Sequence, residues 1–190
     1  MNQISFEIGN IRKKKRTQKR IKFWIVFSAE TVLVIVLAWL FVKCFLTVTT
    51  MPDDSMSNVV GTNNTILIQR FTYKFTAPKR FDVIAFSVDD ARGYYQIKRI
   101  IGLPGERVSI HDGAVYINGK QLNKDIYGDS PIQLAGLAEE EIILDNDEYF
   151  VLGDNRNDSE DSRFSNVGNV SRKRIIGKAE FITKPFRRIK

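Results

Sequence analysis

Ser55 and Lys98 are residues of this chain whose types could together carry out nucleophilic chemistry. The 190 residues include one histidine and one cysteine, His111 and Cys44. A zinc site needs several such ligands, and a Ser–His or Cys–His protease needs a histidine placed against its nucleophile, whereas His111 directly precedes the turn signal Asp112-Gly113. A serine hydroxyl can instead be activated by a lysine whose pKa is lowered in an apolar site. The sequence therefore suggests acyl transfer by a serine with a lysine as its base.

Spacing alone leaves this pair open, because serines and lysines are common at protein surfaces. Ser55 lies in a turn-like segment, residues 53–56, and Lys98 lies in a predicted strand, residues 96–101. By strand alternation Lys98 shares a face with Ile100, so its side chain could be buried. The alternative is an exposed serine and a lysine whose amine reaches solvent along an apolar surface.

A third segment, residues 153–163, strengthens the hypothesis. It follows a predicted strand and reads GDNRNDSEDSR, a run of polar residues and glycine. Such a run is usually a solvated loop. Its many donors and acceptors, with Asp161 and Arg163 able to pair, also suit residues that order an active site from behind.

The elements that would position these residues are predicted to be strands. From residue 47 onward, short alternating apolar runs are bounded by turn residues, which is typical of strands. The clearest runs are residues 65–68, 81–86, 94–101, 149–152 and 178–182. The dipeptide Asp112-Gly113 predicts a hairpin, and Asn118-Gly119 predicts another turn. A weak helical pattern covers residues 134–143.

Residues 23–42 predict a transmembrane helix. They carry one charge, Glu30, and at about 1.5 Å per residue they match the roughly 30 Å hydrocarbon core. Trp24 and Trp39 near the two ends are typical of interfacial anchors. A cleaved signal peptide is the alternative, but this run exceeds the usual apolar length and no small-x-small cleavage signal follows it.

The charge is concentrated before this helix. Residues 1–22 hold eight basic residues and one acidic residue, which leaves 21 basic and 21 acidic residues in 23–190. The positive-inside rule then predicts a cytoplasmic N-terminus and an extracytoplasmic 43–190. The basic tail is expected to be disordered and attracted to anionic lipid. Because the remainder is neutral, no nucleic-acid-binding face is expected.

Three segments in this order resemble the type I signal peptidases, membrane-bound serine–lysine proteases that remove signal peptides from exported proteins. Ser55-Met56 is similar to the start of the family's nucleophile box, and residues 98–106, KRIIGLPGE, are similar to its general-base box. Residues 153–163 fit the family pattern G-D-N-R-x-x-S-x-D-S-R at every fixed position. Two further family strands are similar to residues 80–86 and 176–179.

The resemblance implies roles for particular residues. It implies Ser55 as nucleophile, Lys98 as general base, Ser159, Asp161 and Arg163 as supporting residues, and Met56 and Ile97 as residues of the substrate pockets. Ser159 would hydrogen-bond the lysine, and Asp161 would pair with Arg163. The pockets would take small side chains at the first and third positions before the cut. No metal or cofactor is implied.

The chain departs from the family around the nucleophile. The family's box usually reads S-M-x-P-T-L-x-x-G-D, whereas residues 55–64 read SMSNVVGTNN. Asn58 replaces a proline, which frees the torsion φ and predicts a more mobile loop. Asp53 lies where some members have a serine hydroxyl that supports the oxyanion, and a carboxylate facing an oxyanion would repel it.

These departures favour a specialised peptidase with narrow substrates over a general one. The alternative from another class is a membrane-anchored, non-catalytic binding or assembly factor for exported surface proteins that uses the same fold. The five intact catalytic and supporting residues argue against it. A cytoplasmic autoprotease of repressor type conflicts with the anchor and the missing DNA-binding segment.

The predicted fold is therefore a mostly β, antiparallel catalytic domain preceded by one N-terminal transmembrane helix. The expected domains are a basic cytoplasmic tail (1–22), an anchor (23–42) and an extracytoplasmic peptidase domain (43–190) with a less regular lobe near 120–147. The expected partners are signal-peptide-bearing precursors and the lipid bilayer, and no nucleic acid. Whether an accessory partner completes the nucleophile loop stays open.

Overall fold

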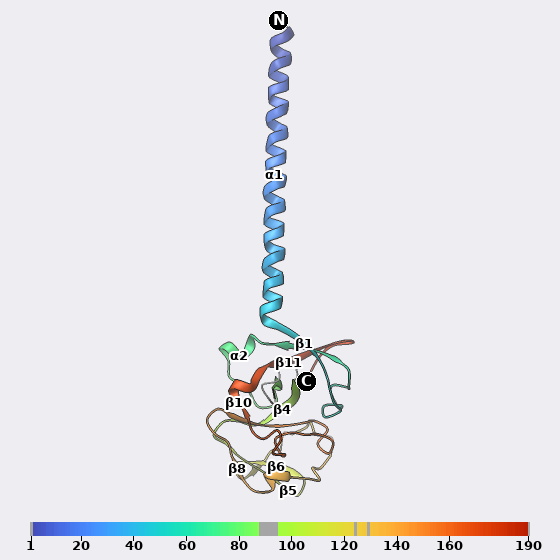
Figure 1. Cartoon of the computed structure of the whole chain (residues 1–190), viewed down its shortest axis with the longest axis vertical. Coiled ribbons are helices and arrows are strands. Elements are labelled where there is room, and N and C mark those ends of the chain that lie inside the picture. Colours follow the sequence, from blue (N-terminus) through green and yellow to red (C-terminus); the bar gives the residue numbers. More distant parts are fainter. Residues whose placement is uncertain (1, 88–94, 124, 129, 190) are drawn as a thin grey trace. The chain divides into compact units, whose positions relative to one another are not determined.

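Two units make up the computed structural model, Met1–Cys44 and Phe45–Lys190. The structure describes residues 2–87, 95–123, 125–128 and 130–189. The first unit is helical, and the second, called the β unit here, consists of two antiparallel sheets (Figure 1). The prediction of a mostly β fold with one N-terminal helix is confirmed.

The first unit is built on α1, which runs without a break over Asn2–Phe45 (Figure 1). Its part Gln18–Phe45 is long and apolar enough to cross a membrane by length and composition. The prediction of a disordered tail is wrong from Asn2 onward, where the backbone is helical. The lysines and arginines there are good helix formers, and extending an existing helix avoids the cost of a new nucleus.

The larger sheet of the β unit has eight strands and carries the candidate site. Neighbouring strands follow the order β1 (Leu46–Thr50), β2 (Thr65–Gln69), β11 (Ile175–Thr183), β3 (Val83–Phe86), β4 (Gln96–Gly102), β9 (Glu148–Leu152) and β10 (Val170–Ser171), and β12 (Phe186–Arg188) pairs with β11. Every described pairing is antiparallel. The order brings β11, from the C-terminal end, between β2 and β3.

The strand β4 lies inside this sheet, between β3 and β9. All seven of its residues are buried, and all four residues of β3 are buried as well. Both faces of β4 are therefore covered, which is why any side chain of this strand, including a charged one, is removed from water. The alternation predicted for residues 96–101 places Lys98 and Arg99 on opposite faces of the strand.

The smaller sheet has four strands in the order β7 (Lys120–Gln121), β6 (Ala114–Ile117), β5 (Arg107–His111) and β8 (Ile142–Ile143). The predicted hairpin forms between β5 and β6. Asp112 and Gly113 have φ of 52° and 74°, the two positive values that a type I′ turn requires. In Figure 1 β5, β6 and β8 lie together at the end of the β unit away from β1 and β11.

The weak helical pattern over residues 134–143 does not give an α-helix. The structure has a 3₁₀ turn, η1 (Gly136–Glu139), followed by β8. Gly136 has φ of 57°, which an α-helix cannot accommodate. The short elements α2 (Thr72–Phe75) and η2 (Arg172–Arg174) were not predicted.

Apolar packing beneath the β1–β2 connection positions the candidate nucleophile. One cluster of buried side chains joins that connection to β2, β4 and β11, with members Met51, Met56, Val60, Ile66, Ile68, Ile97 and Ala179 among others. Met56 follows Ser55 directly, and it is fully buried in this cluster. The side chain next to the nucleophile therefore anchors the turn to the sheet.

Candidate active site

Ser55 lies in a tight turn within the connection from β1 to β2. The turn is closed by backbone hydrogen bonds from Ser57 N to Asp54 O (2.9 Å) and from Val60 N to Met56 O (2.6 Å). Ser55 is 1% exposed. Its hydroxyl is thus held on a backbone that is fixed on both sides.

Lys98 comes from the middle of β4, opposite Ile84 of β3. It is 0% exposed, and its Nζ lies 2.5 Å from Ser55 Oγ. Burial lowers the pKa of Lys98, because desolvation disfavours the ammonium form and outweighs the nearby carboxylates that raise the pKa. The structure thus brings together the two residues that sequence reasoning paired, although 43 positions separate them.

Asp53 is the third group in contact with this pair. Its Oδ1 accepts hydrogen bonds from the Ser55 backbone N–H (3.1 Å) and from the Ser55 hydroxyl (2.6 Å). Its Oδ2 lies 3.4 Å from Lys98 Nζ, and the Asp53 side chain is 40% exposed. The sequence showed that this position departs from the family pattern, but nothing in it indicated that the carboxylate contacts both Ser55 and Lys98, the pair called the dyad here.

The loop at residues 153–163 supports the nucleophile turn from behind. Asn155 N donates to Ser55 O (2.9 Å), and Asn58 Nδ2 donates to Asp154 O (3.1 Å). At Gly153 a Cβ atom would lie 2.6 Å from Ser55 O and 2.3 Å from Ser159 Oγ, so only glycine allows this approach. Asn58, which replaces the family's proline, uses its side chain to tie the two segments together.

Ser159 lies beside Gly153, but its expected hydrogen bond to Lys98 is not formed. Within the described part of the chain Ser159 Oγ is buried without a hydrogen-bond partner. The amine of Lys98 instead contacts Ser55 Oγ and the Asp53 carboxylate. The negative charge of Asp53 attracts the amine more strongly than a neutral hydroxyl does.

Asp161 and Arg163 form the expected pair. Arg163 donates from Nε to Asp161 Oδ1 (2.8 Å) and from Nη2 to Asp161 Oδ2 (2.9 Å), a bidentate contact between two buried side chains. Asp161 Oδ2 also accepts from Gly153 N (3.1 Å). This pair therefore holds the glycine on which the close approach of the two segments depends.

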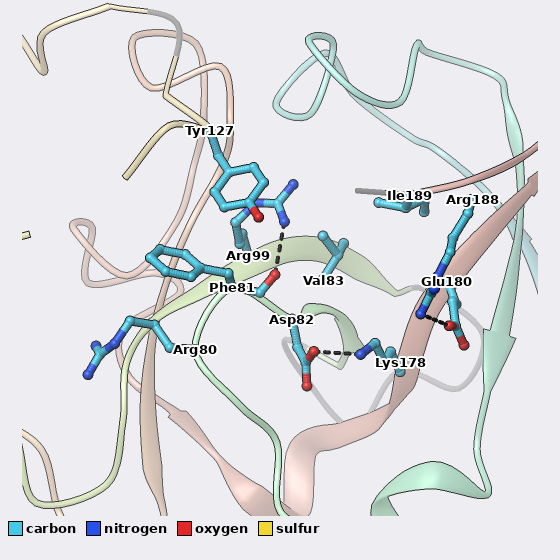
Figure 2. A pocket seen from close by; sticks show the side chains of 10 residues that line it. All are labelled: Arg80, Phe81, Asp82, Val83, Arg99, Tyr127, Lys178, Glu180, Arg188 and Ile189. Carbon is cyan, nitrogen blue, oxygen red and sulfur yellow. Dashed lines mark hydrogen bonds and ion pairs between the residues drawn. The ribbon is translucent and has the colours of Figure 1, made fainter. Parts of the chain in front are cut away.

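A buried ion pair on the other face of β4 was missed by sequence reasoning. Arg99 donates to Asp154 from Nε (2.8 Å) and Nη2 (2.6 Å), and both side chains are essentially unexposed. Arg99 also donates to Phe81 O (2.9 Å) and lies 3.7 Å from the ring centre of Tyr127 (Figure 2). Asp154 thus joins the loop behind Ser55 to the strand that carries Lys98. The sequence held one signal for this ion pair. Arg99 follows Lys98 in a predicted strand, so it had to lie on the opposite face of that strand.

Figure 2 shows the cavity of about 500 Å³ beside Arg99. Four of its charged residues pair with one another, Lys178 with Asp82 (2.6 Å) and Arg188 with Glu180 (2.6 Å). Its other two, Arg80 and Arg99, pair with Glu106 and Asp154, which do not line the cavity. The charged side chains that line this cavity are therefore already in ion pairs. Its chemistry differs from that of the cleft that reaches Ser55.

The cleft that reaches Ser55 has a volume of about 660 Å³ and is lined in part by Asp53, Gln96 and Ser159. The predicted pocket residues Met56 and Ile97 are fully buried in the apolar cluster below it. They lie next to the dyad in sequence and in the core. Their role in taking up substrate side chains stays a prediction.

Comparison with known proteins identifies the family. The model of the family described as "Signal peptidase, peptidase S26" matches residues 23–184. The "Signal peptidase I P" of Bacillus subtilis subsp. natto is 30% identical over 94% of this chain and 97% of its own length. The "Probable signal peptidase I-2" of Synechocystis sp. is 35% identical over 68% of this chain, and the match spans 59% of that protein's length.

A crystal structure of a signal peptidase I from Enterococcus faecalis V583 is 33% identical to the chain. The match covers 54% of this chain and 97% of that one, with a TM-score of 0.44. The family match spans α1 from residue 23 and nearly all of the β unit. The chain therefore belongs to the signal peptidase family, peptidase S26.

Proposed function

We propose that this protein is a membrane-bound serine endopeptidase that removes N-terminal signal peptides from exported precursor proteins. The observation that carries the proposal is the 2.5 Å contact between the buried Lys98 Nζ and Ser55 Oγ. The curated relatives named signal peptidase I support the substrate class. A non-catalytic binding factor has no chemical need for a desolvated lysine against a serine, so this alternative is not favoured.

In the proposed reaction Ser55 is the nucleophile and Lys98 is the general base. Neutral Lys98 takes the hydroxyl proton, Ser55 Oγ bonds to the scissile carbonyl carbon, and the amide nitrogen leaves after receiving that proton. Water, deprotonated by the same lysine, then releases the acyl group. The lowered pKa of Lys98 supports this role, because burial makes the neutral amine available at lower pH than for an exposed lysine.

The supporting residues are proposed to hold other groups in position. Asp161 and Arg163 hold Gly153 in place, and Gly153 permits the contact of residues 153–155 with the nucleophile turn. Ser159, whose hydroxyl faces Gly153, is proposed to orient Lys98 once the amine is neutral and released from Asp53. Met56 and Ile97 are proposed to shape pockets for small side chains before the cut.

We propose further that Gln18–Phe45 crosses the membrane with the N-terminus in the cytoplasm. The eight basic residues in 1–22 support this orientation. The β unit would then act on the outer side, where exported precursors emerge. The departures around Ser55 favour a narrow set of precursors.

The test is processing of a signal-peptide-bearing precursor in membranes by the full chain and by Ser55→Ala and Lys98→Ala. We expect cleavage after a small residue by the unmutated chain, and loss of cleavage in both variants with the fold intact by circular dichroism. Ser57→Ala is the matched control, because Ser57 lies two positions further along the same turn. In the described part of the chain the Ser57 hydroxyl accepts one hydrogen bond, from Asn155 Nδ2 (3.2 Å), and it does not contact Lys98. Full cleavage by either dyad variant contradicts the proposal.

A further inference from the structure

We propose that Asp53 is a third catalytic residue, which covers the oxyanion position in the free protein and receives a proton from Lys98 when substrate displaces it. This inference rests on the proposed function of the Ser55–Lys98 pair. It concerns one of the positions at which this chain departs from the family pattern.

The carboxylate occupies the place that the reaction needs. Acyl transfer by Ser55 produces an oxyanion, and the Ser55 backbone N–H is the donor nearest the attacking atom. In the structure that N–H donates to Asp53 Oδ1 over 3.1 Å. A substrate carbonyl therefore reaches the donor only after the carboxylate has moved away, and the 40% exposure of the side chain leaves room to move toward solvent.

The same carboxylate holds both reacting atoms in an unproductive arrangement. The Ser55 hydroxyl donates to Asp53 Oδ1 over 2.6 Å, so its hydrogen is directed at the aspartate. Lys98 donates to Ser55 Oγ over 2.5 Å and to Asp53 Oδ2 over 3.4 Å. In this state the amine is a donor to the nucleophile, whereas attack requires it to be the acceptor.

The charges around Lys98 show why displacement of Asp53 matters. Desolvation lowers the pKa of Lys98, whereas Asp53, Asp161 and Glu160 raise it. Asp161 is bound by Arg163, and the neighbours of Lys98 across β3 are apolar. Of these carboxylates Asp53 favours the ammonium form most strongly, and it also hydrogen-bonds the amine. When Asp53 moves away from Lys98, desolvation of the amine favours its neutral form.

The proton transfer balances without another reagent. The ion pair of Lys98 ammonium and Asp53 carboxylate becomes a neutral amine and a carboxylic acid. One N–H bond breaks with its electron pair remaining on nitrogen, and one O–H bond forms. Exclusion of water by the substrate favours this neutral pair. Asp53 then releases the proton to solvent at its exposed side, and the Ser55 hydroxyl turns to Nζ.

A purely structural role would look similar in the free protein. An aspartate that bonds the backbone N–H two residues on forms a common turn, and this contact alone would stabilise the loop. The two roles differ in their effect on pH dependence. A structural carboxylate stays beside Lys98 when substrate is bound, so its replacement by an amide that keeps the turn moves the pH limbs of kcat and kcat/KM together.

The test uses Asp53→Asn in the full chain in detergent, with a peptide that has alanine at the first and third positions before the cut. The pH profile of kcat/KM reports the free enzyme and that of kcat reports the bound complex. In the unmutated chain we expect the acidic limb of kcat/KM at higher pH than that of kcat. In Asp53→Asn we expect the two limbs to coincide, with the kcat/KM limb moved to lower pH.

Two outcomes of the Asp53→Asn profiles overturn the proposal. An unchanged separation of the limbs in Asp53→Asn means that Asp53 does not control Lys98. Limbs that move together mean that Asp53 stays beside Lys98 in the complex. The matched control is Asp54→Asn, which removes the adjacent carboxylate, whose described partner is Thr62. We expect Asp54→Asn to leave both limbs in place, and an equal shift there overturns the specific role of Asp53.

A measurement without substrate separates this inference from the proposed function. Lysine-labelled protein is titrated by NMR, and Lys98→Ala identifies the Lys98 signal. We expect Lys98 to lose its proton at lower pH in Asp53→Asn than in the unmutated chain, even if no peptide is cleaved. Coincident titrations overturn the proposal. If Asp53→Asn fails to fold, Asp53→Ser, which supplies a neutral hydroxyl, takes its place in both measurements with the same expectations.

Discussion

At the scale of single residues the proposed chemistry depends on Lys98, a lysine that is not exposed to water. An isolated ammonium in such a place is costly, and a lysine relieves the cost by losing its proton. Lys98 differs from Arg99, its neighbour on β4, in this respect. The arginine stays charged and is matched by the bidentate Asp154, whereas the lysine contacts a hydroxyl and a partly exposed carboxylate.

The first prediction concerns the pH dependence of cleavage. Burial lowers the pKa of Lys98, and the base must be neutral, so kcat should rise with pH through that lowered pKa. The rise should be complete at a lower pH than an ordinary lysine would allow. The measurement is a kcat profile with the full chain in detergent. A rate that rises only where exposed lysines titrate, near pH 10 (about 10.4 for a model peptide), would contradict the account.

Lys98→Arg is the control for this profile, because arginine keeps the positive charge and cannot act as a base. Loss of the base should reduce kcat by about 10² to 10⁴-fold. Retention of the rate in this variant would show that the lysine acts through its charge alone.

At the scale of elements the site depends on two segments whose backbones pack directly against each other. The loop after β9 contacts the turn between β1 and β2 at Gly153, where a Cβ atom would meet Ser55 O at 2.6 Å. A backbone oxygen in a hydrogen-bonded turn cannot move as a flexible side chain can. The position of the nucleophile is therefore set by a residue that has no side chain.

The second prediction is that Gly153→Ala displaces Ser55 and reduces activity more than stability. Overpacking of this kind costs about 1–3 kcal/mol of unfolding free energy. Because the clash falls on Ser55 itself, cleavage should fall by at least about 10²-fold. Gly61→Ala is the matched control, since its Cβ would meet only Asn64 Oδ1 at 3.7 Å. Equal activity of the two variants would refute the role of this approach.

The third prediction concerns the ion pair that joins the loop to β4. Asp154→Ala leaves the buried Arg99 without its bidentate partner, so it should lower the unfolding free energy by about 3–5 kcal/mol. Glu141→Ala breaks the exposed pair with Arg107, whose side chains are 43% and 57% exposed, and should cost at most about 1 kcal/mol. Denaturant unfolding of both variants measures the contrast, and similar losses would contradict it.

At the scale of the whole molecule the sequence predicted the classes of element better than their arrangement. Alternating runs and the Asp112-Gly113 turn predicted local strands and a hairpin, because these depend on neighbouring residues. The insertion of β11 between β2 and β3 depends on pairings between residues about 90 to 115 positions apart, and no local pattern encodes it.

The site shows the same limit. The proximity of Ser55 and Lys98 was predicted through the family resemblance, and strand alternation allowed the burial of Lys98. The contacts of Asp53 and the Arg99–Asp154 pair were missed, because they depend on how three separate segments fold together. The basic tail (1–22) was expected to be disordered, but from Asn2 onward its backbone is helical, as an extension of the apolar part of α1.

The fourth prediction concerns the orientation of the chain in the membrane. Cys44→Ser removes the one native cysteine, and a single cysteine is then introduced by Gln3→Cys or by Lys120→Cys, an exposed position of β7. A membrane-impermeant maleimide should label Lys120→Cys in intact cells and Gln3→Cys only after lysis. The reverse pattern would contradict the proposed orientation.

The most direct test of the central claim is to trap the acyl-enzyme. The full chain is mixed with the peptide substrate, quenched with acid within the first turnover, digested and mapped by mass spectrometry. The account predicts that the N-terminal part of the peptide is attached through an ester to Ser55, and that no such adduct forms in Lys98→Ala. Cleavage by a chain that never carries the adduct on Ser55, or an adduct on another residue, would contradict the account.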